Sequence, residues 1–151
     1  MLYLQLFLDD YRYIISTEHV AEITPWVKLT KVPKTPEYIV GLCSYRGLSV
    51  PVIDICELFL GRPCKRKLST RIIFLESNYG SDNGKIIGIL AEKATEIIRI
   101  NENSFMSPGI YGSDIPFIGP VVADEDGLIT KLMPKEIFSK IDKELLFDKA
   151  I

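Results

Sequence analysis

Residues 41–54 read GLCSYRGLSVPVID, and they decide the fold because two apolar runs meet there at one arginine–glycine pair. Each run has the length and the β-branched content of a strand, and Gly47 supplies the conformational freedom that a turn between them needs. The segment therefore predicts a β-hairpin. Arg46 is permanently charged and stands where the apolar pattern is interrupted, so it can anchor a substrate, clamp an internal carboxylate or belong to a docking surface.

Short strand-like runs separated by turn residues continue on both sides of this hairpin. We expect further strands at residues 2–8, 11–16, 70–76, 85–91, 94–100, 120–123 and 128–133, and either a strand or one helical turn at 19–24. The proline-rich residues 24–37 are expected to form an extended connector. About ten strands without βαβ alternation predict a mainly-β fold of two small five-stranded barrels.

Two helices interrupt this pattern. Asp54 as N-cap and Glu57 three residues later match a capping box in front of ICELFL, and Gly61 ends that short helix. Apolar residues at i, i+4 and i+8 predict an amphipathic helix near the end of the chain; they are Ile137, Ile141 and Leu145.

The strands fall into two groups on either side of the capped helix and the KRK cluster at residues 65–67. We therefore expect one domain over residues 1–140, with two barrel subdomains dividing near residues 65–70, and a helical tail over residues 141–151. Between the strands at 70–76 and 85–91, Asn83-Gly84 predicts a tight hairpin turn.

The composition limits the class of protein. The 151 residues are 47% hydrophobic, with 18 Lys and Arg against 20 Asp and Glu and a pI of about 5.5. Such a chain is expected to fold as a globule, and it lacks the basic face typical of nucleic-acid binders. Strand packing accounts for the one basic–aromatic stretch, Tyr11–Tyr13. No apolar run approaches the roughly 20 residues that span a bilayer. We expect a cytoplasmic protein with no nucleic-acid partner and no direct membrane insertion.

The sequence offers no convergent set of reactive groups. His19 is the only histidine, and none of the motifs GxSxG, GxGxxG and GxxxxGK[ST] occurs. Cys43, Cys56 and Cys64 form no CxxC pair, and Cys43 and Cys56, which lie in apolar runs, are expected to be small buried hydrophobes. The spacing of the carboxylates selects no acid–base pair. We therefore expect no enzymatic activity, no cofactor and no metal.

The order of the motifs resembles that of the CheW-like family, the adaptor proteins of bacterial chemosensory arrays. The motifs are, in chain order, VAEI at residues 20–23, P-x-x-P formed by Pro33 and Pro36, YIVGLCSYRG, VPVIDICELFLG, IIGILAEKATEIIRI and LMPKEIF. The resemblance extends from Leu2 to Phe138.

The resemblance implies two intertwined five-stranded SH3-like barrels and a function without catalysis. Such adaptors couple the regulatory domain of a CheA-type histidine kinase to the cytoplasmic tips of methyl-accepting chemoreceptors, so the chain is expected at membrane-associated receptor arrays. The receptor-binding residues carried over by the resemblance are Arg46, Glu22, Val20, Gly41 and Gly47. The corresponding kinase-binding residues are Val32, Pro33, Ile39 and Leu48.

Alternatives stay open at this point. Arg46 can act only as a structural clamp for Glu22, or Glu22 can orient Arg46 beside an apolar groove where a receptor helix docks. The chain can also be a specialised CheW-like protein of a non-flagellar pathway, such as pilus motility, or one that binds a single partner. It departs from the family pattern at residues 43–45, at Ala91-Glu92 and at Met133.

Overall fold

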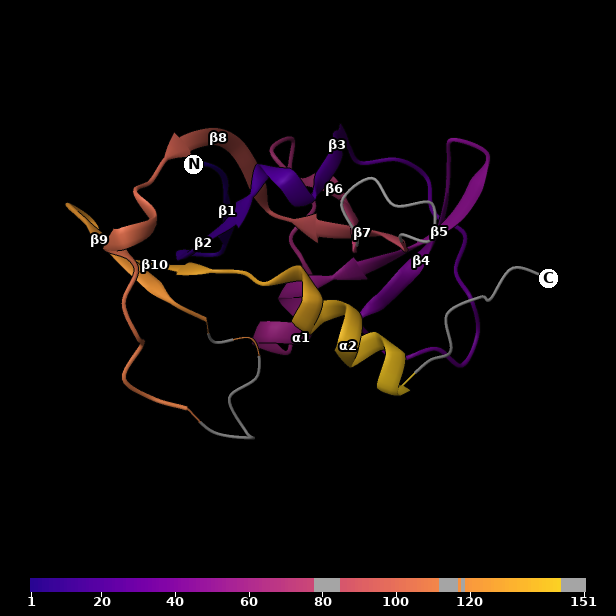
Figure 1. Cartoon of the computed structure of the whole chain (residues 1–151). Coiled ribbons are helices and arrows are strands. Elements are labelled where there is room, and N and C mark those ends of the chain that lie inside the picture. Colours follow the sequence, from indigo (N-terminus) through magenta and orange to yellow (C-terminus); the bar gives the residue numbers. More distant parts are fainter. Residues whose placement is uncertain (78–84, 112–116, 118, 145–151) are drawn as a thin grey trace.

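The structure is a computed structural model that describes residues 1–77, 85–111, 117 and 119–144 (Figure 1). Within these residues, ten strands form two five-stranded sheets. The first sheet has the order β8-β1-β2-β10-β9 and consists of β1 (Leu2–Leu8), β2 (Tyr11–Ser16), β8 (Lys93–Arg99), β9 (Val121–Asp124) and β10 (Gly127–Lys131). The second has the order β3-β6-β7-β5-β4 and consists of β3 (Val20–Pro25), β4 (Ile39–Tyr45), β5 (Leu48–Asp54), β6 (Arg71–Glu76) and β7 (Ile86–Ala91). The predicted mainly-β fold is confirmed.

The helical elements are short. Helix α1 (Ile55–Leu60) follows β5, and α2 (Pro134–Glu144) follows β10, with 3-10 turns at Thr17–His19 and Glu102–Ser104. In Figure 1 the first sheet lies on the left, the second on the right, and both α-helices lie below the region where the sheets meet. Residues 19–24 hold the end of a 3-10 turn and most of β3, so both expected structures occur there.

The strands of each sheet come from distant parts of the sequence. The chain leaves the first sheet after β2 and returns to it at β8, where Leu2 pairs with Arg99. Strands β6 and β7, which follow residues 65–70, belong to the same sheet as β3, β4 and β5, which precede them. We expected the two barrels to divide near residues 65–70. The two sheets do not divide there. The division into a domain at 1–140 and a tail at 141–151 stays a prediction.

Strand β1 lies between two apolar cores. Its leucines Leu4, Leu6 and Leu8 join a large cluster shared by both sheets and both α-helices, whereas Tyr3 joins a small cluster within the first sheet. Gln5 is also buried. The alternation predicted for residues 2–8 is present, but it separates two buried faces rather than a buried and a solvated one.

The predicted cap of α1 is half confirmed. The Asp54 carboxylate accepts hydrogen bonds from the backbone amides of Cys56 and Glu57 at 2.9 and 3.2 Å, and Gly61 ends the helix with a φ of 73°. The reciprocal bond of a capping box is not formed, because the Asp54 backbone amide donates to the Tyr38 carbonyl at 2.7 Å.

The predicted C-terminal helix is α2, which packs its apolar face on the large core. Ile137, Phe138 and Ile141 are buried there. Leu145, the third residue of the predicted stripe, and the Asn83-Gly84 turn lie outside the described residues.

The Glu92 carboxylate joins the two sheets at the point where the chain crosses from β7 to β8. Its Oε1 accepts the Asp9 backbone amide at 2.6 Å and Nη2 of Arg62 at 3.2 Å; its Oε2 accepts the Lys65 backbone amide at 2.7 Å and Nη1 of Arg62 at 3.2 Å. Asp9 belongs to the β1–β2 turn, and residues 62–65 follow α1. A buried carboxylate is tolerated only with such compensation, and Glu92 is 4% exposed. We call this set the Glu92 clamp.

Burial alone would raise the pKa of Glu92. The hydrogen bonds from Arg62 and from the amides of Lys65 and Asp9, together with the Arg62 charge, outweigh it and lower the pKa of Glu92 from 4.5 to about 2.

Glu92→Gln removes the charge and keeps the size of the side chain. We expect the free energy of unfolding to fall by about 3 kcal/mol, because Arg62 is left beside a neutral amide and a buried N–H loses its acceptor. Urea denaturation followed by circular dichroism measures the change. Glu96→Gln, at an exposed residue of β8, is the control and should change the same quantity by less than about 0.5 kcal/mol. Equal losses in the two variants would contradict the clamp.

The clamp also predicts a pH dependence. Because the pKa of Glu92 is lower in the folded chain, its contribution to stability is present above about pH 4.5 and is lost as the pH falls toward about 2. The difference in unfolding free energy between wild type and Glu92→Gln should therefore be constant near neutral pH and shrink below about pH 4.5. Denaturant titrations at stepped pH measure it. A difference that stays constant across that acidic range contradicts the clamp.

Candidate protein-docking site

Arg46 and Gly47 form a two-residue turn between β4 and β5. Tyr45 and Leu48 are the last paired residues, and the φ angles are 50° at Arg46 and 77° at Gly47. Two positive φ angles in a two-residue loop match a type I′ hairpin, the turn whose twist fits paired strands. Glycine adopts such a backbone without strain, whereas arginine does not. The hairpin predicted from residues 41–54 is confirmed, and its strained position carries the arginine.

The Arg46 guanidinium lies on the surface and contacts Glu22 and Tyr45. It is 3.7 Å from the Glu22 carboxylate on β3, and its central carbon is 5.0 Å from the centre of the Tyr45 ring. The side chains of Arg46 and Glu22 are 62% and 45% exposed. An ion pair this exposed contributes only about 0–1 kcal/mol to stability, so the pair orients Arg46 more than it holds the fold together.

A stacked aromatic pair supports the arginine from below. The rings of Tyr45 and Phe74 are 4.1 Å apart between centroids and nearly parallel, at 10°. Phe74 lies on β6 directly opposite Glu22 on β3. Both rings are buried, so the turn rests on a rigid base of packed side chains.

The connector after β3 closes the free edge of β4. Thr30 and Leu42 exchange backbone hydrogen bonds of 3.0 and 2.8 Å. A Cβ atom at Gly41 would lie 2.7 Å from the Thr30 carbonyl oxygen, so this close approach requires glycine.

The structure brings most of the predicted receptor-binding residues together. Arg46 and Gly47 form the turn, Glu22 contacts Arg46, and Val20 lies half-buried at the start of the same strand. Gly41 is buried beneath the connector, where it lets Thr30 approach β4 closely. Its role in receptor binding stays a prediction.

The predicted kinase-binding residues do not form one surface. Ile39 is buried in the core at 9% exposure, so its role in kinase binding stays a prediction that the exposed surface does not support. Val32 and Pro33 lie on the exposed connector, two or three residues beyond the Thr30–Leu42 bridge, whereas Leu48 is 55% exposed beside Arg46. The five residue steps along β4 from Val40 to Tyr45 span about 17 Å, at about 3.3 Å per residue, and separate the two places.

Sequence reasoning missed the aromatic base of the site. In the sequence, Tyr45 stands out only as a departure from the family pattern, and Phe74 is distant from it along the chain. The signal was the alternation along β4, which places Cys43 and Tyr45 on the buried side of the strand.

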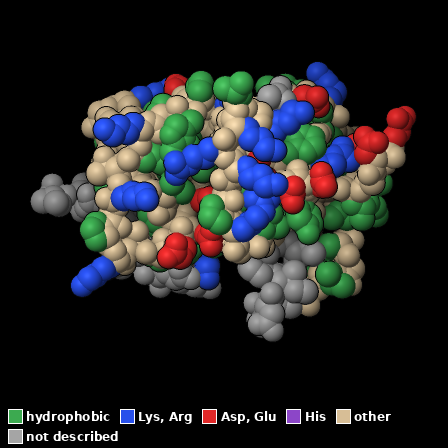
Figure 2. Space-filling view, turned by 180° about the vertical axis from the view of Figure 1, so that it is seen from behind, with side chains coloured by type: hydrophobic (Ala, Val, Ile, Leu, Met, Phe, Trp, Pro, Cys, Tyr) green, Lys and Arg blue, Asp and Glu red, His purple; other side chains and the backbone are tan. Residues whose placement is uncertain are grey.

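Charge is mixed on the face drawn in Figure 2. Lys and Arg side chains gather near its middle, with Asp and Glu side chains beside them and apolar side chains around them. A nucleic-acid-binding face is expected to be uniformly basic, and this face is not.

Comparison with known proteins now decides the family. The CheW-like domain model matches residues 2–142. The chain belongs to the CheW-like family. The resemblance read from the motifs is confirmed, and with it the expected fold of two SH3-like barrels.

Relatives of this CheW-like chain include proteins named for chemotaxis. It is 27% identical to the chemotaxis protein CheW of Helicobacter pylori over 134 residues, which cover 88% of this chain and 78% of that protein. It is 25% identical to the protein FrzA of Myxococcus xanthus over 105 residues, covering 70% and 62% of the two chains. The crystal structure of the scaffolding protein TtCheW from Thermoanaerobacter tengcongensis superposes with a TM-score of 0.76 at 28% identity, covering 87% of this chain and 83% of that one.

The family and these relatives indicate a CheW-like scaffold protein of chemotaxis. The names of these relatives specify no catalytic activity. Within the described residues, no helix is long and apolar enough to cross a membrane.

Arg46→Asn tests whether the Arg46 side chain contributes to the stability of the fold. Asn-Gly is the preferred type I′ sequence, so the variant relieves strain at φ 50° while it loses a weak ion pair. We expect the free energy of unfolding to stay the same or rise by up to about 1 kcal/mol. Thermal and urea denaturation check this. A loss of more than about 1 kcal/mol would make Arg46 a structural clamp.

Proposed function

We propose that the chain is a non-enzymatic adaptor that couples methyl-accepting chemoreceptors to a CheA-type histidine kinase in bacterial chemotaxis. Membership of the CheW-like family supports the class of function. The observation that carries the proposal is the Arg46 guanidinium, exposed but oriented by Glu22 and by the Tyr45 ring at a rigid hairpin. In this role the chain works in the cytoplasm and is recruited to membrane-associated receptor arrays.

The receptor-facing surface consists of Arg46, Gly47, Glu22 and Val20, with Leu48 added from its place in the structure. Leu48 lies across the hairpin from Tyr45 and supplies exposed apolar area next to the charge. A receptor helix can pack an apolar stripe on Leu48 and Val20 and place a carboxylate or amide against Arg46. Arginine beside an apolar contact is a common centre of binding energy.

The kinase-facing surface is then the exposed connector at Val32 and Pro33. It lies at the other end of β4 from Arg46, which leaves room for the receptor and the kinase on one chain at the same time. This separation of surfaces favours a bridging adaptor.

Arg46→Asn should weaken receptor binding by at least about tenfold, or about 1.4 kcal/mol, and leave kinase binding within about twofold. The reason is that the variant keeps the turn and removes the oriented charge. Co-sedimentation with receptor-containing membranes and a separate titration with the kinase regulatory domain measure the two affinities. Arg66→Asn is the matched control, because Arg66 is also exposed and stacks on an aromatic ring, that of Trp26, at 4.1 Å.

Val32→Asp is the reciprocal variant and should weaken kinase binding only. Unchanged receptor affinity in Arg46→Asn, with the chain folded, removes the receptor role of this turn. Loss of both affinities in either variant removes the two-surface arrangement.

A second candidate function is supported by the similarity to FrzA. In this alternative the chain is a specialised CheW-like protein of a non-flagellar chemosensory pathway, such as pilus or gliding motility, or binds only one of the two partners. Titrating receptor and kinase fragments separately distinguishes a single-partner protein, because only one of them then binds.

A further inference from the structure

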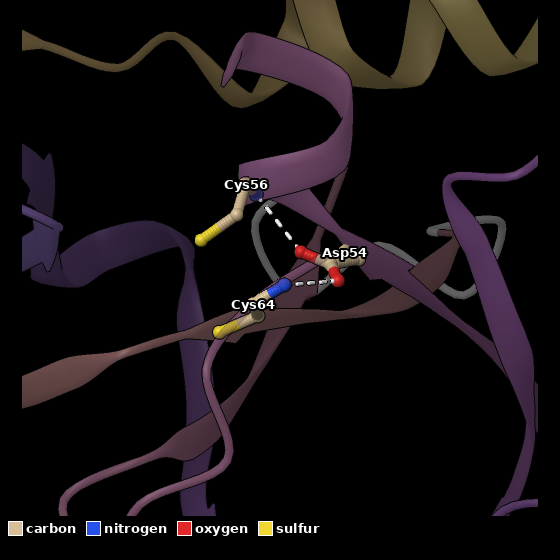
Figure 3. Close-up of side chains that lie close together, drawn as sticks. All are labelled: Asp54, Cys56 and Cys64. Carbon is tan, nitrogen blue, oxygen red and sulfur yellow. Dashed lines mark hydrogen bonds between the residues drawn. The ribbon is translucent and has the colours of Figure 1, made fainter. Parts of the chain in front are cut away.

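Two of the three cysteines, eight residues apart in the sequence, are neighbours in the structure. Cys56 lies in the first turn of α1, and Cys64 follows the Gly61–Pro63 segment that ends this helix. Figure 3 shows both sulfur atoms pointing to the same side, with the Asp54 carboxylate facing the backbone amides of the two cysteines. One Asp54 oxygen and the two sulfurs all lie within 4.8 Å of one another. We propose that Cys56, Cys64 and Asp54 bind one thiophilic divalent cation of the zinc class.

The donor set fits such a cation. Thiolate sulfur selects soft and borderline metals, and a carboxylate oxygen completes common zinc sites. Tetrahedral zinc, with Zn–S bonds of about 2.3 Å, needs sulfurs about 3.8 Å apart, which small side-chain rotations reach from the observed positions. All three residues are buried, at 5%, 0% and 7% exposure for Asp54, Cys56 and Cys64, so hydration competes little for the ligands.

Asp54 has an oxygen available. Among the described residues, its Oδ1 accepts two backbone amides, those of Cys56 and Glu57, whereas Oδ2 accepts only that of Cys64, at 2.8 Å. A carboxylate oxygen has two acceptor positions, so Oδ2 keeps one for a cation. The amide bonds also hold the carboxylate between the helix start and Cys64, which fixes its orientation in advance.

The charge balance favours exchange of protons for a metal. Without an ion, the site has two neutral thiols and one carboxylate, a net charge of −1. Binding M²⁺ releases two protons and gives two thiolates, one carboxylate and the ion, again −1. Because the net charge of the buried site is unchanged, burial does not oppose the exchange as it opposes a bare thiolate.

The same surroundings act against a redox role. Disulfide formation requires a thiolate nucleophile. The pKa of the Cys64 thiol is raised far above its ordinary value. The causes are a hydrogen bond with Cys56, burial, and the nearby carboxylates of Asp54 and Glu92. A cation reverses this effect because it is attracted by the charges that disfavour the thiolate.

Titration of the reduced, chelator-treated chain with Co²⁺ tests the site. We expect one Co²⁺ per chain, a sulfur-to-cobalt charge-transfer absorption, tetrahedral ligand-field bands, and displacement by one equivalent of Zn²⁺. In weak buffer, Zn²⁺ should release about two protons per ion. Cys56→Ala and Cys64→Ala should each weaken binding at least about a hundredfold.

Cys43→Ala is the matched control. Cys43 is also buried and free but lies on β4, so this variant should bind Co²⁺ like the wild type. The proposal is overturned if the folded, reduced chain shows no charge-transfer band. It is also overturned if the band persists in a variant with both Cys56→Ala and Cys64→Ala, or if the band is lost in Cys43→Ala. Proton release depends on the wild-type chain alone, and fewer than about one proton per ion overturns the proposal even if a variant fails to fold. A Cys56–Cys64 disulfide in the unreduced chain, with no cation uptake after reduction, overturns it as well.

Discussion

The Glu92 carboxylate holds three segments that are far apart in the sequence: the β1–β2 turn, the segment after α1 and the crossing from β7 to β8. Each oxygen accepts two donors, so the unfavourable burial of a charge is offset and the carboxylate stays ionised. The large apolar core lies between the sheets that this contact joins. Both α-helices pack on this core, and α1 is followed directly by the segment that the carboxylate holds.

The surface proposed for docking depends on this framework without contributing much to it. Arg46 is exposed, its ion pair with Glu22 is weak, and its backbone conformation is unfavourable for arginine. What keeps the guanidinium in place is the buried Tyr45–Phe74 stack beneath it. Such a strained and exposed residue on a rigid base is typical of positions that serve recognition rather than stability.

Much of the fold follows from local signals in the sequence. Gly47 and the flanking apolar runs identify the hairpin, Asp54 and Gly61 bound α1, and the motif order identifies the family. Long-range contacts have no such signal. The burial of Gly41 results from the approach of the connector at Thr30, and the meeting of Cys56 with Cys64 results from the path of the chain after Gly61. Glu92 looked like a mere departure from the family pattern because its partners lie 30 and 83 residues away.

The crossing of the chain between the sheets has a consequence for how the protein is made. The β1–β2 hairpin leaves the ribosome before its sheet partners β8 and β10, which are synthesised only after the whole second sheet. The second sheet can assemble from a continuous stretch, whereas the β1–β2 hairpin keeps two unpaired strand edges until β8 and β10 follow. During that interval the nascent chain exposes aggregation-prone strand edges, which a chaperone can bind and protect.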